Sequence, residues 1–193
     1  MKRVIFVLLV SMWFLTSCVG IKGNGNVVSQ ERVANGFYDI TQNSLASVNV
    51  HLSEDYKVEV TTDDNLQDFI FVEVKDSVLY INTKDSINLR PTKLIVDVYL
   101  PKLQSIILNG IGNVTLSNGN ASNLNISLVG IGSIDAQNYQ VKNITIQNSG
   151  IGSAKIWATD SLKGTLSGIG KISYKGNPEV SINVSGIGKV NKL

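Results

Sequence analysis

The chain has 193 residues, of which 43% are hydrophobic and 17% charged, and its formal net charge is +2. A single Cys excludes an intramolecular disulfide, and one His with one Cys is too few for a zinc site made of these ligands. No basic patch interleaved with aromatic residues occurs, so nucleic acid is not an expected partner.

Residues 1–17 are predicted to be a signal peptide that is removed from the mature protein. Lys2 and Arg3 form its basic start, and residues 4–10 form an apolar run too short for a stable membrane span. Leu15-Thr16-Ser17-Cys18 then resembles a bacterial lipobox that is cleaved before Cys18. Lipidation of Cys18 would anchor the protein, because several acyl chains hold a membrane far more firmly than one. A plain secretory signal with an incidental Cys is the alternative.

Residues 18–31 are predicted to be a flexible tether between the lipidated Cys18 and one domain over residues 32–193. The segment contains Gly23-Asn24-Gly25-Asn26, but it lacks the Gly-Lys-Ser/Thr ending of a phosphate-binding loop. Loss of Lys2 and Arg3 leaves fifteen basic and fifteen acidic residues, so the mature protein is expected to be neutral.

Between residues 37 and 108 six segments have the alternation of strands: 37–40, 45–52, 56–61, 69–74, 78–81 and 93–100. They are expected to form larger, less regular coils, or a sheet that covers the first coil. Asp63, Asp64 and Asp68 have oxygen ligands for calcium but not the spacing of a calcium loop, so a solvated turn is favoured. His51 is interpreted as a strand surface residue.

From residue 110 onward the tripeptide Gly-Ile-Gly returns at intervals of 20, 20, 18 and 18 residues. Its five copies are Gly110-Ile111-Gly112, Gly130-Ile131-Gly132, Gly150-Ile151-Gly152, Gly168-Ile169-Gly170 and Gly186-Ile187-Gly188. Apolar and polar residues alternate between the copies, which indicates strands, and the fixed period indicates one structural unit per repeat. We therefore predict an all-β fold, a right-handed parallel β-helix (solenoid) with coils of 18–20 residues and a less regular N-terminal part.

The direction of the motif isoleucines decides whether the motif is structural or functional. Glycine tolerates positive φ and close backbone approach, so each motif is expected to mark a corner of a coil. Strict alternation would point the glycines inward and build an exposed ridge of isoleucines. A bend at each Gly would instead bury the isoleucines, and this arrangement is favoured because an exposed apolar ridge needs a partner. An exposed ridge would be the best binding-site candidate in the chain.

Several features follow one another in a recognisable order. They are the lipobox Cys18, Gly23-Asn24-Gly25, Phe37, Leu79-Tyr80-Ile81, Pro101-Lys102-Leu103 and the recurring Gly-Ile-Gly from Gly110. Together they resemble the auto-transporter adhesin head domain known as the GIN domain, which is common in Bacteroidetes lipoproteins. The likeness covers residues 23–193. It implies a β-helix-like fold and a cell-envelope location, and it brings no catalytic residues.

The chain offers little catalytic chemistry. The acids from residue 110 onward are Asp135, Asp160 and Glu179, at unrelated repeat positions, so the repeats predict no column of carboxylates of the kind a β-helix polysaccharide lyase or hydrolase uses. The residues directly after the five motifs are Asn113, Ser133, Ser153, Lys171 and Lys189. Such a polar column could bind sugars, and it is also typical of any soluble solenoid face. Three aromatic residues could stack on sugars: Tyr139, Trp157 and Tyr174.

Three further segments resemble the Asp-Ser/Thr-apolar O-glycosylation signal of Bacteroidetes envelope proteins. They give Ser77, Ser86 and Ser161 as candidate glycosylation sites.

The sequence therefore favours a non-catalytic protein without cofactor or metal, lipid-anchored in a Gram-negative envelope. Its sides are expected to bind a glycan, a protein or another envelope component. One alternative is a carbohydrate-active β-helix enzyme with an unrecognised site, and another is a structural spacer that stacks end to end. The outer membrane is the expected location, with the periplasmic and the outer face both open because no acidic run follows Cys18.

Overall fold

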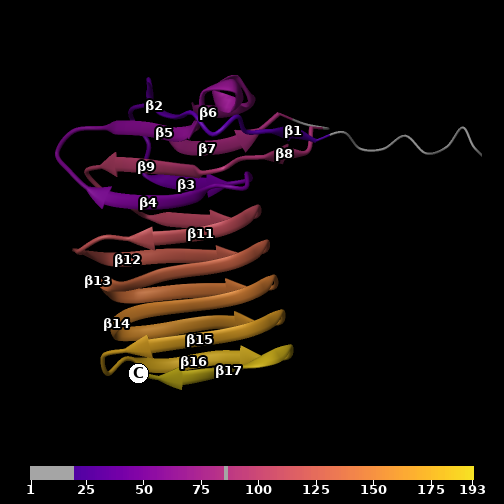
Figure 1. The fold of residues 1–193 in the computed structure, drawn as a ribbon. Coiled ribbons are helices and arrows are strands. Elements are labelled where there is room, and N and C mark those ends of the chain that lie inside the picture. The colour runs from indigo at the N-terminus through magenta and orange to yellow at the C-terminus, as the bar shows by residue number, and fades with distance from the viewer. Residues whose placement is uncertain (1–19, 85–86) are drawn as a thin grey trace, which may run out of the picture.

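The computed structural model of the protein describes residues 20–84 and 87–193, which are built almost entirely of β-strands. Its N-terminal part holds β1 (Ile21–Lys22), β2 (Val27–Arg32), β3 (Asp39–Gln42), β4 (Ser47–Leu52), β5 (Lys57–Asp63), the 3-10 helix η2 (Asp64–Phe69), β6 (Ile70–Lys75), β7 (Val78–Thr83), β8 (Leu89–Arg90) and β9 (Leu94–Leu100). Below it in Figure 1 lie β10 (Ser105–Leu108), β11 (Ile111–Leu116), β12 (Gly119–Leu128), β13 (Ile131–Asn148), β14 (Ile151–Leu166), β15 (Ile169–Lys175), β16 (Glu179–Val184) and β17 (Ile187–Lys192).

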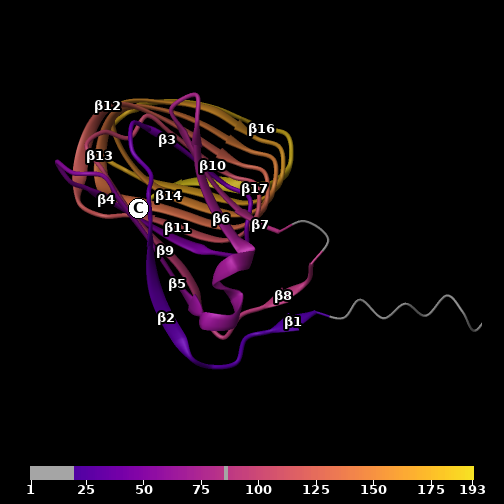
Figure 2. The same ribbon diagram turned by 90° about the horizontal axis from the view of Figure 1, so that it is seen from above.

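The coils stack through two parallel ladders. One runs β4–β11–β13–β14–β15–β17, and the other runs β3–β10–β12–β13–β14–β16. Strands β13 and β14 are long enough to take part in both ladders. Figure 2 looks along the stack and shows the strands wrapping around a common interior. The predicted all-β solenoid of stacked parallel coils is confirmed.

Equivalent positions of the repeat pair with one another, so the register equals the repeat interval. Ile131 pairs with Ile151, Ile151 with Ile169, and Ile169 with Ile187. The inward column four residues after the first Gly is fully buried in its first four members, Val114, Ile134, Ala154 and Ile172. Complete burial of one branched aliphatic side chain contributes about 1.5–3 kcal/mol. Such columns hold each coil to the next.

The two ends of the stack differ. At the N-terminal end β2, β5 and β9 form an antiparallel sheet beside β4, and the β6–β7 hairpin lies beside β3. Because β9 and β7 pair in parallel with β4 and β3, this part contains both a less regular coil and a covering sheet, the two arrangements that the sequence left open. At the other end β16 and β17 pair only with β14 and β15 within the described residues, and the inward residues Ile182 and Val190 stay half-buried. One end of the solenoid is covered and the other is open.

The predicted tether is wrong for residues 20–31, because β1 pairs with β8 and β2 pairs with β5. The turn between β1 and β2 is held by acidic side chains. Gly25 N–H and Thr92 N–H each donate to the Asp63 carboxylate at 2.7 Å, and the Asn24 and Asn26 amides donate to Asp64. We call these contacts the N-terminal clamp. Cys18 and the predicted signal peptide lie outside the described residues.

Asp63 is buried, so the solvated-turn interpretation is wrong for this residue, whereas Asp64 and Asp68 are exposed. Burial of the Asp63 carboxylate opposes its ionisation, but the hydrogen bonds from Thr92 and Gly25 outweigh this effect and lower the pKa of Asp63. Asp63 therefore acts within the clamp as an ionised acceptor for two separate segments.

Candidate binding surface: an apolar ridge along the coils

The five motif isoleucines face solvent, so the favoured prediction of buried corners is wrong. Ile111, Ile131, Ile151 and Ile169 are 49–52% exposed, and Ile187 is 75% exposed. The chain bends at the residues just before each Ile, and a new strand begins at the Ile itself. Alternation then continues through the second Gly, which keeps the isoleucines outward and the glycines inward.

The glycines allow the coils to approach closely at this corner. A Cβ on Gly132 would overlap the carbonyl oxygen of Gly112 one coil above, and a Cβ on Gly130 would overlap that of Gly110. Because these positions have no side chains, Ile131 N–H can donate to Gly110 O at 3.0 Å, and the backbone hydrogen bonds between neighbouring coils continue through the corner. The motif therefore stacks its isoleucines at the spacing of paired strands, about 4.8 Å.

A sixth apolar side chain, Leu45, extends the row. The segment Ser44-Leu45-Ala46 occupies the coil position of a Gly-Ile-Gly motif, because Ile111 N–H donates to Ser44 O at 2.9 Å as Ile131 N–H does to Gly110 O. Leu45 is 38% exposed. We call Leu45, Ile111, Ile131, Ile151, Ile169 and Ile187 together the apolar ridge. Leu45 was missed from the sequence alone because Ser44-Leu45-Ala46 lacks both glycines of the motif and lies 66 residues before Gly110-Ile111-Gly112. Its only signal in the sequence was the pattern of a small, an apolar and a small residue.

Two polar columns border the apolar ridge. On the side that precedes each Ile the column begins as an asparagine ladder, in which Asn109 donates to Asn43 at 3.0 Å and Asn43 to Asn82 at 2.8 Å. It continues with Val129, Ser149, Ser167 and Ser185, of which Val129 is 52% exposed and widens the apolar surface. The column on the other side is the one predicted from the sequence, and it consists of Asn113, Ser133, Ser153, Lys171 and Lys189.

Charge is distributed unevenly along the stack. Residues 110–193 contain seven Lys and three acids, whereas residues 18–109 contain eight basic and twelve acidic residues. Lys171 and Lys189 are exposed and lie two residues after Ile169 and Ile187. The part of the apolar ridge that is far from the covered end is therefore bordered by positive charge.

The aromatic residues considered for sugar stacking are not gathered into a platform. Tyr139 is buried, and burial raises the pKa of its phenol. The Lys175 ammonium lies 3.9 Å from the ring centroid of Trp157 and so occupies one face of that ring. Tyr174 is half-buried on β15. Neither Tyr139 nor the face of Trp157 beneath Lys175 is free for a sugar ring.

The structure brings Ser117 and Asp97 to His51, which the sequence did not predict. Ser117 Oγ lies 2.8 Å from His51 Nδ1, but Asp97 Oδ1 lies 3.6 Å from Nε2, which is too long for a hydrogen bond. Asp97 instead accepts from Asn49 at 2.9 Å, and the Tyr99 ring stacks on the imidazole. His51 remains a partly exposed strand residue, as interpreted, and Asp97 does not orient its ring as a catalytic triad requires.

The covering sheet also aligns three acids that the repeat analysis did not consider. Glu31 pairs with Glu59 and Glu59 with Asp97 on neighbouring strands. Lys57 Nζ lies 3.1 Å from Glu59, and the Asn49 amide donates to Asp97, so both carboxylates have partners. Over residues 20–84 and 87–193, no group of three or more His, Cys, Asp or Glu residues could hold a metal ion.

Two of the candidate glycosylation residues are described. Ser77 lies in the turn between β6 and β7 with φ of 62°, after Asp76 with φ of 51°, and it is half-buried. Ser161 lies within β14 and is also half-buried. Ser86 falls outside the described residues. Neither Ser77 nor Ser161 borders the apolar ridge. Glycosylation of these serines stays a prediction that is separate from binding at the ridge.

Comparison with known proteins gives the family. The description "Putative auto-transporter adhesin, head GIN domain" matches residues 36–118 and 107–178. The fold resembles a crystal structure described as a "putative adhesin" from Bacteroides fragilis, with 21% identity, a TM-score of 0.64, and coverage of 90% of this chain and 100% of that one. A "putative lipid binding protein" from Parabacteroides distasonis has 23% identity, a TM-score of 0.54, and coverage of 91% and 100%.

At these identities the two structures support the fold alone, and a search of curated proteins finds no match. Among residues 20–84 and 87–193 no helix is both long and apolar enough to span a membrane. The family description, by contrast, matches most of the chain. The chain belongs to the auto-transporter adhesin head GIN domain family.

Proposed function

We propose that the protein is a non-catalytic, lipid-anchored adhesin of the cell envelope, and that it binds a partner protein through the apolar ridge. The observation that carries this proposal is the exposure, in register, of six aliphatic side chains on successive coils. Contiguous exposed apolar surface on a soluble domain marks an interaction site more often than isolated apolar residues do. Family membership supports the adhesin role.

The shape and charge of the ridge define the partner. Six side chains at the spacing of paired strands make a straight row about 24 Å long and one side chain wide. Lys171 and Lys189 border its lower part. The complementary surface is an elongated apolar groove with acidic residues along one side. An anionic membrane is disfavoured, because interfacial surfaces use Trp and Tyr beside Lys or Arg, and the ridge has no aromatic residue.

Anchoring is proposed through lipidated Cys18 at the outer membrane. The N-terminal clamp would then lie near the membrane and the open end of the solenoid farther from it. Cys18→Ser should move the protein from the membrane fraction to the soluble fraction after export. Protease accessibility on intact cells distinguishes the outer face of the membrane from the periplasmic face.

Binding to envelope vesicles from the cells that make the protein tests the ridge. The ridge variant combines Ile131→Lys and Ile151→Lys. The matched control combines Thr145→Lys and Thr165→Lys, which add the same charge at exposed positions on the other ladder. We expect saturable binding that is lost in the ridge variant, kept in the control, and abolished when the vesicles are first treated with protease.

Three results would count against the proposal. Binding that survives in the ridge variant would remove the ridge from the interface. Binding that survives protease treatment but not periodate treatment would make the partner a glycan. Equal binding to protein-free anionic lipid vesicles would make the membrane itself the partner.

A structural spacer is the second candidate function, and the open last coil favours it. The outer edges of β16 and β17 have no partner within the described residues, and Val184 and Leu193 are 43% and 59% exposed there. An unpaired strand edge is a site for adding further strands. Concentration-dependent association in sedimentation velocity, unchanged in the ridge variant, would support end-to-end stacking over ridge binding.

A further inference from the structure

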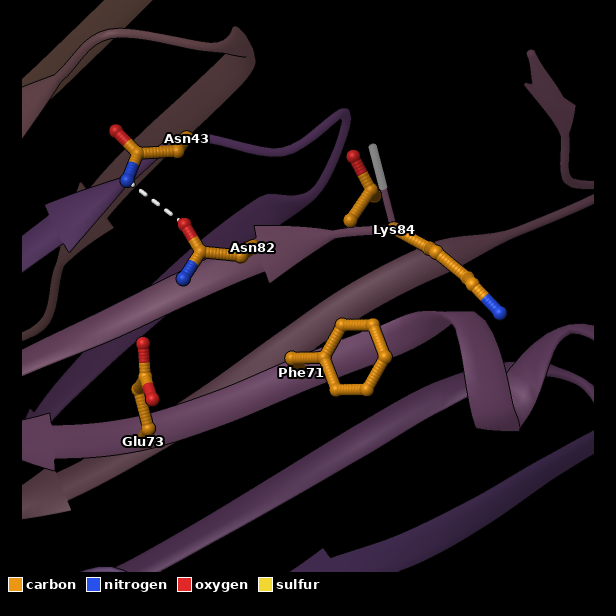
Figure 3. A pocket seen from close by; sticks show the side chains of 6 residues that line it. Asn43, Phe71, Glu73, Asn82 and Lys84 are labelled. Atoms are coloured by element: carbon orange, nitrogen blue, oxygen red, sulfur yellow. Dashed lines mark hydrogen bonds between the residues drawn. The ribbon is translucent and has the colours of Figure 1, made fainter. Parts of the chain in front are cut away.

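A second surface feature lies at the covered end of the molecule, where the β6–β7 hairpin meets the end of β3, and no ridge side chain lines it. It is a hollow of about 670 Å³. Its lining residues are Asn43, Phe71, Glu73, Asn82, Thr83 and Lys84, most of them labelled in Figure 3. The volume falls in the range of about 300–1,000 Å³ that is usual for small-molecule sites.

One wall of the hollow is an exposed aromatic ring. Phe71 is 47% exposed on β6, a strand that pairs only with β7 within the described residues. Its neighbours Ile70 and Val72 point to the opposite face, where Ile70 is buried, so the alternation of β6 places the Phe71 ring outward. Figure 3 shows this ring lying below Asn82 and beside Glu73. The Phe71 ring therefore does not pack in the hydrophobic core, and solvent reaches it.

The polar groups around the ring are fixed and partly unused. Asn43 donates to Asn82 Oδ1 at 2.8 Å, and Asn109 donates to Asn43 Oδ1 at 3.0 Å, so the asparagine ladder holds both lining amides in place. In Figure 3 the Asn82 amide nitrogen points toward the side where Glu73 and Phe71 lie. Among the described residues Glu73 forms neither an ion pair nor a side-chain hydrogen bond. An amide donor and a carboxylate acceptor therefore both remain free beside the ring.

Among the described lining residues, Glu73 is the one acid and Lys84 the one base, so their charges balance. The Lys84 ammonium lies 5.9 Å from the centroid of Phe69, and in Figure 3 it points away from Asn82. A phosphate or carboxylate ligand would meet Glu73 without a cluster of cations to offset the repulsion. The ligand that fits is neutral overall, has many hydroxyl groups, and has one apolar face.

We propose that this hollow binds a neutral saccharide, with one sugar ring stacked on Phe71 and its hydroxyl groups bound by Glu73, Asn82 and Asn43. A pyranose ring presents C–H groups on one face and hydroxyl groups around its edge, each able to donate and accept. The Phe71 face receives the C–H groups. The Glu73 carboxylate accepts from hydroxyl groups in charge-assisted hydrogen bonds, and the Asn82 amide donates to them. This site shares Asn43 and Asn82 with the column that borders the ridge, but none of the ridge side chains lines it, so it adds a second ligand to the proposed adhesin.

The test uses full-length protein in a detergent without sugar groups. The probes are methyl glycosides of glucose, galactose, mannose and N-acetylglucosamine and their short neutral oligomers. Saturation-transfer NMR detects binding and titration calorimetry measures it. We expect at least one probe to bind with a Kd of about 1 mM or tighter, and Phe71→Ala to weaken that binding at least about tenfold. Glu73→Gln should weaken it about fivefold or more, because a charge-assisted hydrogen bond becomes a neutral one.

The controls separate the site from folding and from the ridge. Tyr38→Ala truncates another exposed aromatic residue, 39% exposed and outside the hollow, and it should leave saccharide binding unchanged. The ridge variant Ile131→Lys/Ile151→Lys should bind saccharide normally even where it loses envelope binding, so the two proposals fail separately. Failure of every probe to bind, or binding that Phe71→Ala leaves intact while circular dichroism shows a folded protein, would overturn the saccharide site.

Discussion

The replacement Gly132→Ala tests whether the motif glycines exist to let neighbouring coils approach. A Cβ at this position would lie 1.7 Å from the Gly112 carbonyl oxygen, whereas ordinary van der Waals contact begins at 3.4 Å. The coils would therefore have to part by about 1.7 Å at this corner. Ile131 N–H donates to Gly110 O at 3.0 Å beside it, and such a movement would break this bond and the next one along the ladder.

Two lost ladder bonds cost about 1 kcal/mol each. Alanine at the Gly132 φ of 148° adds backbone strain of about 1–2 kcal/mol. We therefore expect the free energy of unfolding to fall by about 3–4 kcal/mol, a large share of the 5–15 kcal/mol that is typical of a domain. Gly36→Ala is the matched control, because Gly36 also has a positive φ, of 71°, but a Cβ there would meet nothing within 4 Å. It should cost only about 1–2 kcal/mol of strain.

Urea unfolding followed by circular dichroism measures both variants beside the parent protein. Equal losses in Gly132→Ala and Gly36→Ala would refute the reasoning, since both glycines have a positive φ but only Gly132 has a neighbouring carbonyl in the way of a Cβ. A parent-like Gly132→Ala would show that the coils can separate at the corner without cost. In either case the row of isoleucines would not depend on the motif glycines for its spacing.

Three further predictions concern single side chains. Ile151→Ser should change the free energy of unfolding by less than about 1 kcal/mol in urea titrations, because Ile151 is already half-exposed. The same replacement should weaken binding to envelope vesicles about three- to tenfold, as expected when about 1 kcal/mol of apolar burial at the interface is lost. The pKa of Asp63 is lowered in the folded protein, so ionised Asp63 stabilises the fold above pH 3.8, the ordinary value, and this contribution is lost as the pH falls through the folded pKa. The difference in unfolding free energy between the parent protein and Asp63→Asn should therefore be largest above pH 3.8 and shrink in acid; a difference that stays constant in acid would contradict this sign. Gln42→Leu should cost about 1–2 kcal/mol in the same titrations, because the buried Gln42 amide donates to Ser44 O and Ala46 O, each at 2.9 Å, and Leu cannot.

The solenoid could be predicted because identical residues stack on identical residues. The interval between Ile131 and Ile151 in the sequence is also their pairing register, so the repeat gives the fold directly. The strand pairing of the N-terminal part could not be predicted from a repeat interval. Between the coil of Leu45 and that of Ile111 the chain forms β5–β9, in which β7 and β9 pair in parallel with β3 and β4 on the other side of the Leu45 coil. The Leu45 coil and its continuation at Ile111 are therefore far apart in sequence. The tether prediction failed for the same reason, since the partner of Gly25 is Asp63, 38 residues later in the chain.

The sequence predicted the exposed row of isoleucines only as the alternative, whereas buried isoleucines were the favoured prediction. Alternation predicted Ile151 outward, but glycine gives no side chain from which to read the parity of a strand, so a bend at the motif was equally consistent with the sequence. The bend instead precedes the Ile, at residues such as Asn109 and Gly110. The hollow beside Phe71 had no sequence signal at all. It combines Asn43 with two strands that follow about thirty residues later, and only the pairing of β3 with β7 brings them together.

The N-terminal clamp determines how a tethered copy of the protein would respond to mechanical load. A pull on the chain before Gly20 reaches the fold through β1, which shares only two residues with β8, and then through the Asp63 carboxylate that joins Gly25 to Thr92. These contacts lie at the covered end, and the five motif isoleucines begin strands of the coils beyond it, from β11 to β17 (Figure 1). Tension between a membrane anchor and a bound partner would therefore unfold the first strands while the coils that carry the apolar ridge stay folded. The released N-terminal segment would extend, and this extension would lower the force on the interface between the apolar ridge and its partner.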